Sequence, residues 1–176
     1  KRELSKYKKK IFSSITKSLE SGQIFFGKQI KQLERNFSKK YKSKFGVAVG
    51  SGTDAILISL KSLDIQKGDE VITAANTAIP TISAIRSVGA TPKLVDIGED
   101  YLMDVTKIER MITTKTKAII PVHLYGQSCD MDEIIRISKK YKLKVIEDCA
   151  QSQGSKYKNK YCGTIGDIGC FSFYPT

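Results

Sequence analysis

Apolar residues recur every three or four positions through the first part of the chain, which is the spacing of one face of an α-helix. One set predicts an amphipathic helix over residues 4–20, closed by Gly22, and consists of Leu4, Tyr7, Ile11, Ile15 and Leu19. A second set follows the short apolar connector 24–27, predicts another helix, and consists of Ile30, Leu33, Phe37 and Tyr41. Neither helix carries obvious chemistry. We therefore expect residues 1–45 to form an N-terminal helical segment.

Beyond residue 45, short apolar runs alternate with amphipathic stretches, and turn residues separate them. Strands are predicted at 47–49, 70–73, 92–97, 117–122 and 143–148. Helices are predicted between them, at 55–63, 81–88, 105–111 and 131–141. Repeated strand–helix alternation predicts an α/β fold over residues 46–176, with a mainly parallel sheet flanked by helices.

The predicted strand at 143–148 ends abruptly in two carboxylates, Glu147 and Asp148. In open α/β sheets ligands bind outside the carboxyl ends of the strands, so Asp148 would lie where a ligand lies. Gln151 follows closely enough to serve the same ligand from the loop. The alternative is that Asp148 is only the N-cap of a following helix.

A glycine-containing turn, 50–54, stands between the first predicted strand and a helix. Glycines let the backbone approach a ligand, and the free N–H groups and dipole of a helix start favour an anion. Thr53 can add a hydroxyl donor. The alternative is an ordinary helix start, capped by Ser51, Thr53 or Asp54. The turn is not a P-loop, because no Gly-Lys-Ser/Thr follows.

Two polar residues stand among apolar ones near predicted strand ends. His123 follows the strand at 117–122, and either a structural or a catalytic role fits a lone histidine there. Ser172 interrupts an apolar strand near the end of the sequence, where a serine is usually a neutral ladder position. The loop 76–80 ends the strand at 70–73, so all of these polar loops are expected at one edge of the sheet.

The length and the net charge of the chain limit the number of domains and the kinds of partner that we expect. A chain of 176 residues is one domain or one large piece of a domain, and its formal net charge is +12. The lysine clusters fall mainly on predicted helices, where they form a solvated face, and no nucleic-acid-binding motif accompanies them. We therefore expect no nucleic-acid partner, although a phosphorylated small substrate would be steered by this field.

Cysteine usage and hydropathy place the protein in the cytoplasm. The four cysteines show no metal-ligand spacing, are expected to be reduced thiols, and are Cys129, Cys149, Cys162 and Cys170. No apolar run approaches the roughly 20 residues that cross a bilayer, and the start has no signal-peptide pattern. Because the sequence starts without methionine and stops after an apolar strand, both ends are expected to be cut.

Four segments stand in the order and spacing of one protein family, namely 50–55, 121–127, 145–151 and 171–176. With them, the chain from Ser21 to Thr176 resembles the DegT/DnrJ/EryC1/StrS family of pyridoxal-phosphate-dependent sugar aminotransferases. The motifs Glu-Asp-Cys-Ala-Gln and Phe-Ser-Phe-Tyr-Pro-Thr are specific, whereas the glycine turn is not. The resemblance implies the large domain of a fold-type I transferase, without its C-terminal small domain.

The resemblance also implies residue roles. Asp148 matches the acid that pairs with the pyridine nitrogen of pyridoxal 5′-phosphate, and Gln151 matches the residue that hydrogen-bonds its phenolic oxygen. A carboxylate at that position keeps the nitrogen protonated, which makes the ring an electron sink. The phosphate would be held by residues from two segments, namely Gly52, Thr53, Asp54 and Ser172.

Two features of the family's site are missing from this sequence. The family's Schiff-base lysine is expected directly after Thr176, so residues 1–176 alone are expected to be inactive. The family often stacks an aromatic side chain on the cofactor ring, and Ala78 stands at that position, so stacking must be weaker or come from elsewhere.

The implied reaction moves an amino group from an amino acid, with glutamate as the expected donor, to a nucleotide-diphosphate keto sugar. One alternative is a keto-sugar dehydratase of the same family, in which histidine replaces the lysine. A non-catalytic cofactor-binding regulator is another. The apolar content of the first helices also needs a cover, and the family builds its site at a subunit interface, so a homodimer is expected.

Overall fold

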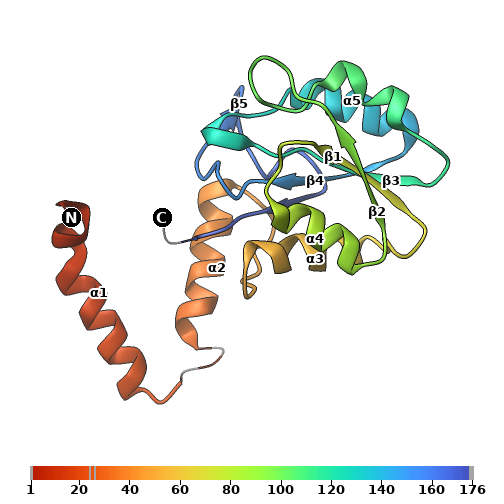
Figure 1. Ribbon diagram of the computed structural model, residues 1–176. Coiled ribbons are helices and arrows are strands. Elements are labelled where there is room, and N and C mark those ends of the chain that lie inside the picture. The colour runs from red at the N-terminus through yellow and green to blue at the C-terminus, as the bar shows by residue number, and fades with distance from the viewer. Residues whose placement is uncertain (1, 24, 26, 175–176) are drawn as a thin grey trace. The chain divides into compact units, whose positions relative to one another are not determined.

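The computed structural model describes residues 2–23, 25 and 27–174. It divides into two compact units, residues 1–48 and 49–176 (Figure 1). No helix in the described ranges is long and apolar enough to cross a membrane.

The first unit consists of two helices, as their apolar spacing predicts. α1 spans Arg2–Glu20, and its end is marked by Gly22, whose backbone is left-handed at a φ of 66°. α2 spans Lys28–Tyr41 and ends at Lys42, which is also left-handed. The apolar face of α1 is exposed in the single chain along Tyr7, Ile11, Phe12, Ile15 and Leu19. Two of the predicted connector residues, 24 and 26, lie outside the described ranges.

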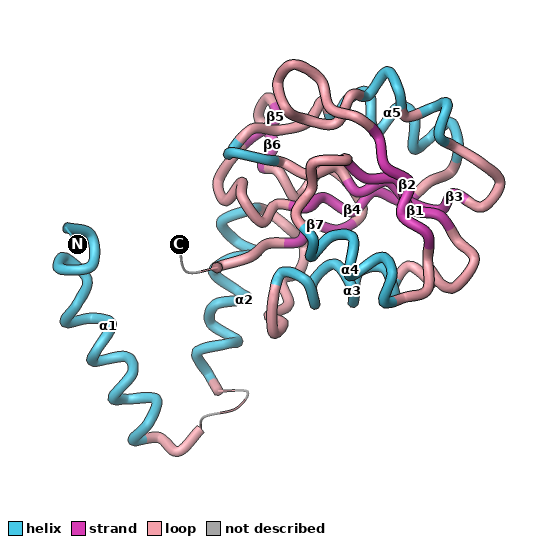
Figure 2. The backbone as a smooth tube through the Cα atoms, viewed as in Figure 1, coloured by secondary structure: helices cyan, strands magenta, loops and turns pink. Residues whose placement is uncertain are grey.

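The second unit is built on a five-stranded parallel sheet in the order β2-β1-β3-β4-β7. Its strands are β1 (Glu70–Ala74), β2 (Thr91–Val95), β3 (Thr116–Ile120), β4 (Lys144–Asp148) and β7 (Ile168–Cys170). A small antiparallel ribbon, β5 (Lys156–Tyr157) and β6 (Lys160–Tyr161), stands apart from this sheet (Figure 2). The predicted α/β fold class is confirmed.

Helices cover both faces of the sheet. α3 (Gly52–Ser62) and α4 (Ile79–Ser87) pack side by side on one face, and α5 (Met131–Tyr141) lies on the other (Figure 1). Two buried clusters follow from this arrangement, one on each face. Val145 and Ile146 are neighbours in β4 but belong to opposite clusters, because successive strand residues point to opposite faces. A strand that is buried on both faces therefore has a continuous run of apolar residues in its sequence.

Two sequence predictions at the start of the α/β region need correction. The strand predicted at 47–49 is absent: Val47 is 78% exposed, and the N–H of Ala48 donates to Glu34 Oε1 at 2.9 Å rather than to a neighbouring strand. The loop predicted at 76–80 is shorter, because α4 already begins at Ile79. Pro80 fits the first helical turn, where its missing N–H costs no hydrogen bond.

The helix predicted at 105–111 is instead two 3₁₀ turns, η1 (Val105–Lys107) and η2 (Glu109–Met111). The Asp104 carboxylate accepts both the N–H and the hydroxyl of Thr106, at 3.1 and 2.6 Å, which favours a tight turn over an α-helical start. A third 3₁₀ turn, η3 (Leu124–Gly126), follows β3. The strand predicted at 92–97 ends at Val95.

The strand predicted to contain Ser172 also ends earlier, at Cys170. Cys170 is paired with Asp148, the last residue of β4, so no residue of β4 remains to pair with Ser172. Ser172 therefore lies beyond the carboxyl end of the sheet and not within a strand.

Candidate functional site

The candidate site residues lie at the carboxyl edge of the sheet, where β4 and β7 end and α3 begins. Parallel strands in register bring Asp148 and Cys170 to the same level. The structure brings the candidates into two groups: Asp148 contacts the first turn of α4, and Gly52 contacts Ser172. No hydrogen bond joins these two groups within the described ranges.

Asp148 is a buried carboxylate, and each of its two oxygens accepts a hydrogen bond from the protein. Oδ2 accepts the hydroxyl of Thr81 at 2.8 Å, and Oδ1 accepts the N–H of Ala150 at 3.1 Å. Its backbone is fixed as well, because its N–H donates to the carbonyl of Pro121 and its carbonyl accepts the N–H of His123. No helix starts after Asp148, since residues 149–152 form a turn, so the N-cap interpretation is wrong.

Burial raises the pKa of Asp148, while the hydrogen bonds from Thr81 and Ala150 oppose that shift. A buried carboxylate is costly unless it is hydrogen-bonded or paired with a cation. This group is therefore suited to a positively charged partner at the sheet edge, such as a protonated ring nitrogen.

The glycine turn is a capped helix start, with Ser51 as the N-cap. Ser51 Oγ accepts the N–H of Asp54 at 3.0 Å and donates to Asp54 Oδ2 at 2.9 Å. The cap therefore already uses the N–H of Asp54. The N–H groups of Gly52 and Thr53 and the Thr53 hydroxyl have no acceptor within the described ranges. A cap and an anion site are thus compatible here, with Gly52 and Thr53 as the available donors.

Gly52 and Ser172 meet where the chain leaves β7. A β carbon placed on Gly52 would lie 2.9 Å from Cβ of Ser172, closer than real side chains approach, and 3.3 Å from its Oγ. Glycine is therefore required for this approach. Gln153 donates its side-chain N–H to the carbonyl of Ser172, and the Ser172 hydroxyl accepts the N–H of Tyr174 at 3.3 Å. These contacts place the Ser172 hydroxyl beside the first turn of α3.

Gln151 is an exposed residue whose amide is partly held. Its Oε1 accepts the N–H of Tyr125 at 3.3 Å. Tyr125 and Gly126 both have left-handed backbones, with φ of 56° and 76°, which form the tight turn η3 after β3. Because the oxygen of Gln151 accepts a hydrogen bond, its NH₂ group is the end that can donate to a ligand.

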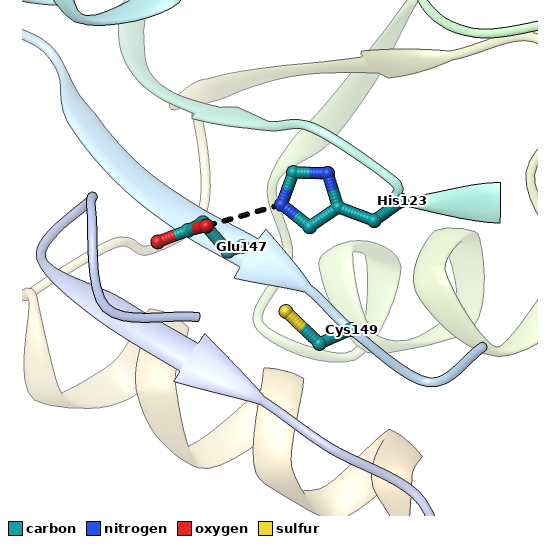
Figure 3. A group of neighbouring side chains, drawn as sticks. All are labelled: His123, Glu147 and Cys149. Atoms are coloured by element: carbon teal, nitrogen blue, oxygen red, sulfur yellow. Dashed lines mark hydrogen bonds and ion pairs between the residues drawn. The ribbon is translucent and has the colours of Figure 1, made fainter. Parts of the chain in front are cut away.

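His123 is fully buried and paired with Glu147, its Nε2 lying 3.0 Å from Oε2 (Figure 3). Its other ring nitrogen, Nδ1, accepts the N–H of Cys129 at 3.1 Å. Nδ1 is therefore unprotonated, and Nε2–H donates to the carboxylate. Both ring nitrogens are used inside the protein, which supports the structural interpretation of His123.

Glu147 accepts three backbone hydrogen bonds besides that of His123, from the N–H groups of Gly163, Ile165 and Gly166 at 2.7–2.8 Å. Burial would raise the pKa of Glu147, but the hydrogen bonds from His123 and these backbone groups outweigh it, and the pKa is lowered. The carboxylate is thus ionised, and it orders the loop that leads into β7.

His123, Glu147 and Cys149 lie close enough to suggest a metal site (Figure 3). However, each potential ligand is already engaged or protonated. The nitrogens of His123 and the oxygens of Glu147 carry the hydrogen bonds just described, and burial raises the pKa of the Cys149 thiol well above its ordinary value. The geometry is that of a hydrogen-bonded core cluster. All four cysteines are free and buried, as expected for reduced thiols.

Three further observations bear on the sequence predictions. Ala78 is the N-cap of α4 and supplies no aromatic ring. The residue after it, Ile79, is exposed and is not aromatic either. Thr176, after which the lysine is expected, lies outside the described residues. Sequence reasoning missed Thr81, although its place just after the polar loop at the same sheet edge was a usable signal.

An open cleft of about 960 Å³ lies at the opposite edge of the sheet, between the end of α5 and the start of β4. Its lining is rich in basic side chains, including Lys139, Lys142 and Lys144. None of the candidate residues lines it. The candidate site is therefore the carboxyl edge, where the buried carboxylate and the helix start are.

Comparison with known proteins shows the family to which the chain is similar. Residues 5–176 match the model of the DegT/DnrJ/EryC1/StrS aminotransferase family. A relative named dTDP-3-amino-3,6-dideoxy-alpha-D-galactopyranose transaminase, from Aneurinibacillus thermoaerophilus, is 47% identical over 96% of this chain and 47% of its own length. The chain thus spans about half the length of that relative.

Solved structures of the family share the fold. DesV of S. venezuelae, in complex with a ketimine intermediate, superposes with a TM-score of 0.96 at 34% identity, covering 99% of this chain and 47% of DesV. A putative sugar aminotransferase of Streptococcus pneumoniae in its PLP form has a TM-score of 0.89 at 36% identity, covering 93% and 46% of the two chains. The predicted fold-type I architecture is confirmed. The chain belongs to the DegT/DnrJ/EryC1/StrS aminotransferase family.

Proposed function

We propose that this chain is part of a PLP-dependent aminotransferase that moves an amino group from an amino acid, with glutamate as the expected donor, to a nucleotide-linked keto sugar. The observation that carries the proposal is the buried, doubly hydrogen-bonded Asp148 carboxylate at the end of β4. The names of the matched relatives, a dTDP-sugar transaminase and a sugar aminotransferase in its PLP form, support the same class of substrate and cofactor.

The residues present fit the phosphate end of pyridoxal 5′-phosphate. The start of α3 offers the N–H groups of Gly52 and Thr53 and the Thr53 hydroxyl, and Gly52 leaves backbone where a side chain would collide with Ser172. A dianion at a helix start gains from these donors and from the helix dipole. The Ser172 hydroxyl would donate from the other side, and Asp54 would contribute mainly by holding the cap.

The ring end of the cofactor fits as well. Asp148 would pair with the protonated pyridine nitrogen, and the NH₂ group of Gln151 would donate to the phenolic oxygen. When bound, the cofactor would supply an electron sink for the carbon that carries the amino group. The lysine proposed to follow Thr176 would carry the proton between the amino-bearing carbon of the bound substrate and the cofactor. Residues 1–176 alone are accordingly proposed to be inactive.

The experiment is an amino-transfer assay with the full-length protein. The protein is incubated with pyridoxal phosphate, glutamate and a dTDP- or UDP-linked 3-keto sugar, and the products are identified and quantified by mass spectrometry. We expect 2-oxoglutarate and the corresponding amino sugar in equal amounts. Without the keto sugar, no amino sugar should form, and release of 2-oxoglutarate should stop after one turnover. Loss of water from the sugar would instead identify a dehydratase, and cofactor binding without turnover would identify a regulator.

We further propose that the functional protein is a homodimer in the cytoplasm. The apolar face of α1 is exposed in the single chain, with Phe12 at 60% and Leu19 at 63%, and a second copy is a natural cover for it. Four buried free thiols fit a reducing compartment.

A further inference from the structure

Thr81 stands out among the buried hydroxyl residues because of where its hydrogen bonds go. It lies in the first turn of α4 and is only 1% exposed. Buried hydroxyl groups in helices commonly donate to the carbonyl four residues earlier, as Ser59 does to Ala55 at 2.7 Å. Thr81 instead accepts the hydroxyl of Thr77 at 2.8 Å and donates to Asp148 Oδ2 at 2.8 Å.

This arrangement fixes the direction of the Thr81 hydrogen. Since Thr77 donates to Thr81 Oγ1, the Thr81 proton is free to point at the carboxylate. Valine has nearly the same shape and would fill the site without burying a hydroxyl, so packing alone does not require threonine. The hydroxyl is therefore explained by its carboxylate partner.

We propose that Thr81 is a positioning residue of the active site, whose hydroxyl orients the Asp148 carboxylate toward the cofactor's ring nitrogen. The inference rests on the proposed function for the cofactor, but the Thr81–Asp148 contact can be tested without it. In the described ranges the Asp148 carboxylate accepts one other hydrogen bond, from the backbone N–H of Ala150. Thr81 is therefore the only side-chain donor to this carboxylate there. Removing that donor leaves Oδ2 unpaired, and the carboxylate is then held only through Oδ1 by the N–H of Ala150.

The other ionisable groups around Asp148 do not compete for this role. His123 and Glu147 are bonded to each other, and the thiols of Cys149 and Cys170 have pKa values raised by burial. A change in the titration of Asp148 on altering Thr81 therefore reports the lost hydroxyl donor and not a rearranged ion pair.

The first test follows the Asp148 carboxyl carbon by NMR as a function of pH in the cofactor-free full-length protein, with Asp148→Asn used for assignment. Thr81→Val is expected to raise the pKa of Asp148, because the ionised form loses a donor. Thr81→Ser should restore the wild-type titration. Thr73→Val is the matched control: it removes another buried threonine hydroxyl, which donates to the Ile120 carbonyl at 2.9 Å, and should leave Asp148 unchanged.

The second test measures the Kd of pyridoxamine phosphate, which binds without a covalent bond to the protein. Thr81→Val should weaken binding about 10-fold, whereas Thr81→Ser and Thr73→Val should change it less than about 3-fold. In an Asp148→Asn background, Thr81→Val should have little further effect, because the two residues act through one contact.

Four outcomes overturn one or both proposals. An unchanged Asp148 titration in Thr81→Val would refute the positioning role. Equal losses of affinity in Thr81→Val and Thr73→Val, or additive losses in the double variant, would show a merely structural effect and refute it too. A wild-type protein that does not bind pyridoxamine phosphate would overturn the proposed function, and the NMR titration would still decide the Thr81–Asp148 contact.

Discussion

Gly52 and Ser172 are in direct contact at the start of α3, although they come from opposite ends of the α/β unit. A β carbon on Gly52 would lie 2.9 Å from Cβ of Ser172. The contact brings together the two segments that form the candidate phosphate site, namely the start of α3 and the chain that follows β7. It makes the site sensitive to a single methyl group.

Gly52→Ala should therefore damage the site. Relieving the collision requires a shift of the chain around Ser172, which costs about 1–3 kcal/mol, and binding of pyridoxal phosphate should weaken by at least about 10-fold. Gly98→Ala is the control, because its β carbon would meet only the flexible Asp100 carboxylate at 3.1 Å. Affinity titrations of both variants decide the matter; equal affinity in Gly52→Ala and wild type would contradict the close contact.

Thr53→Val should weaken cofactor retention and leave the fold intact. The variant loses one neutral hydroxyl donor to the phosphate, a contribution of about 1 kcal/mol, or roughly 5-fold in Kd. Ser62→Ala at the other end of the same helix removes a hydroxyl that donates to the Ser59 carbonyl, and should not change affinity. If both variants bind pyridoxal phosphate like the wild type, the start of α3 is not the phosphate site.

Asp148→Asn should still bind the cofactor, though about as weakly as Thr81→Val does, and should transfer the amino group slowly. A hydrogen bond to a charged group contributes about 1.5–3 kcal/mol, so its loss from the transition state lowers the rate about 10- to 100-fold. Asp167→Asn is a matched control at the other edge of the sheet, where Asp167 accepts the N–H of Val145 at 2.8 Å. Single-turnover kinetics of the full-length protein provide the measurement, and an unchanged rate in Asp148→Asn would remove Asp148 from the reaction.

The strand–helix alternation could be predicted because each element has its own local pattern. The predicted helix at 131–141 agrees residue for residue with α5, whose apolar positions Ile134 and Ile137 are fully buried. The strand at 47–49 could not be judged locally. Three apolar residues resemble a strand, but a strand forms only if a neighbouring strand takes up their backbone groups, and here Glu34 accepts the N–H of Ala48 instead.

The candidate site was predictable as a set of strand ends but not as a set of contacts. That Asp148 ends a buried strand follows from local sequence. That Thr81 donates to it, or that His123 pairs with Glu147, depends on the strand order β2-β1-β3-β4-β7, which no local pattern specifies. The pairing of Gly52 with Ser172 depends in the same way on β7 lying beside β4.

Glu147 should make the protein sensitive to acid. Its folded-state pKa is lowered from the ordinary value of 4.5, so its contribution to the free energy of unfolding is fully present above that pH. The contribution is lost as pH falls below 4.5 toward the folded-state pKa, because the carboxylate must then be protonated against its four donors. In the same pH window, the unfolding free energy of Glu147→Gln should depend less on pH.

Glu147→Gln should also be strongly destabilising at neutral pH. Its NH₂ group would face the N–H of His123 or of a backbone donor, which costs about 2–4 kcal/mol in chemical denaturation. Glu109→Gln is the control, because Glu109 is a surface carboxylate that also accepts several hydrogen bonds. Its three side-chain donors are Arg136, Lys140 and Tyr141. It should lose much less stability, since water screens exposed ion pairs. Equal losses in the two variants would contradict a buried structural role for Glu147.

The helix α1 carries an exposed apolar face in the single chain. Its apolar face is proposed to be covered by a second copy of the protein, so the full-length protein should sediment as a dimer. Ile15→Glu would place a charge in that interface and should weaken dimerisation by about 2 kcal/mol or more, roughly 30-fold in Kd. Ser13→Glu, on another side of the same helix, adds the same charge and should leave the dimer intact, which separates interface loss from an effect of net charge. Sedimentation velocity over a range of concentrations gives both constants. A full-length protein that stays monomeric while transferring amino groups at its full rate would contradict the homodimer, and the exposed face of α1 would then need another occupant.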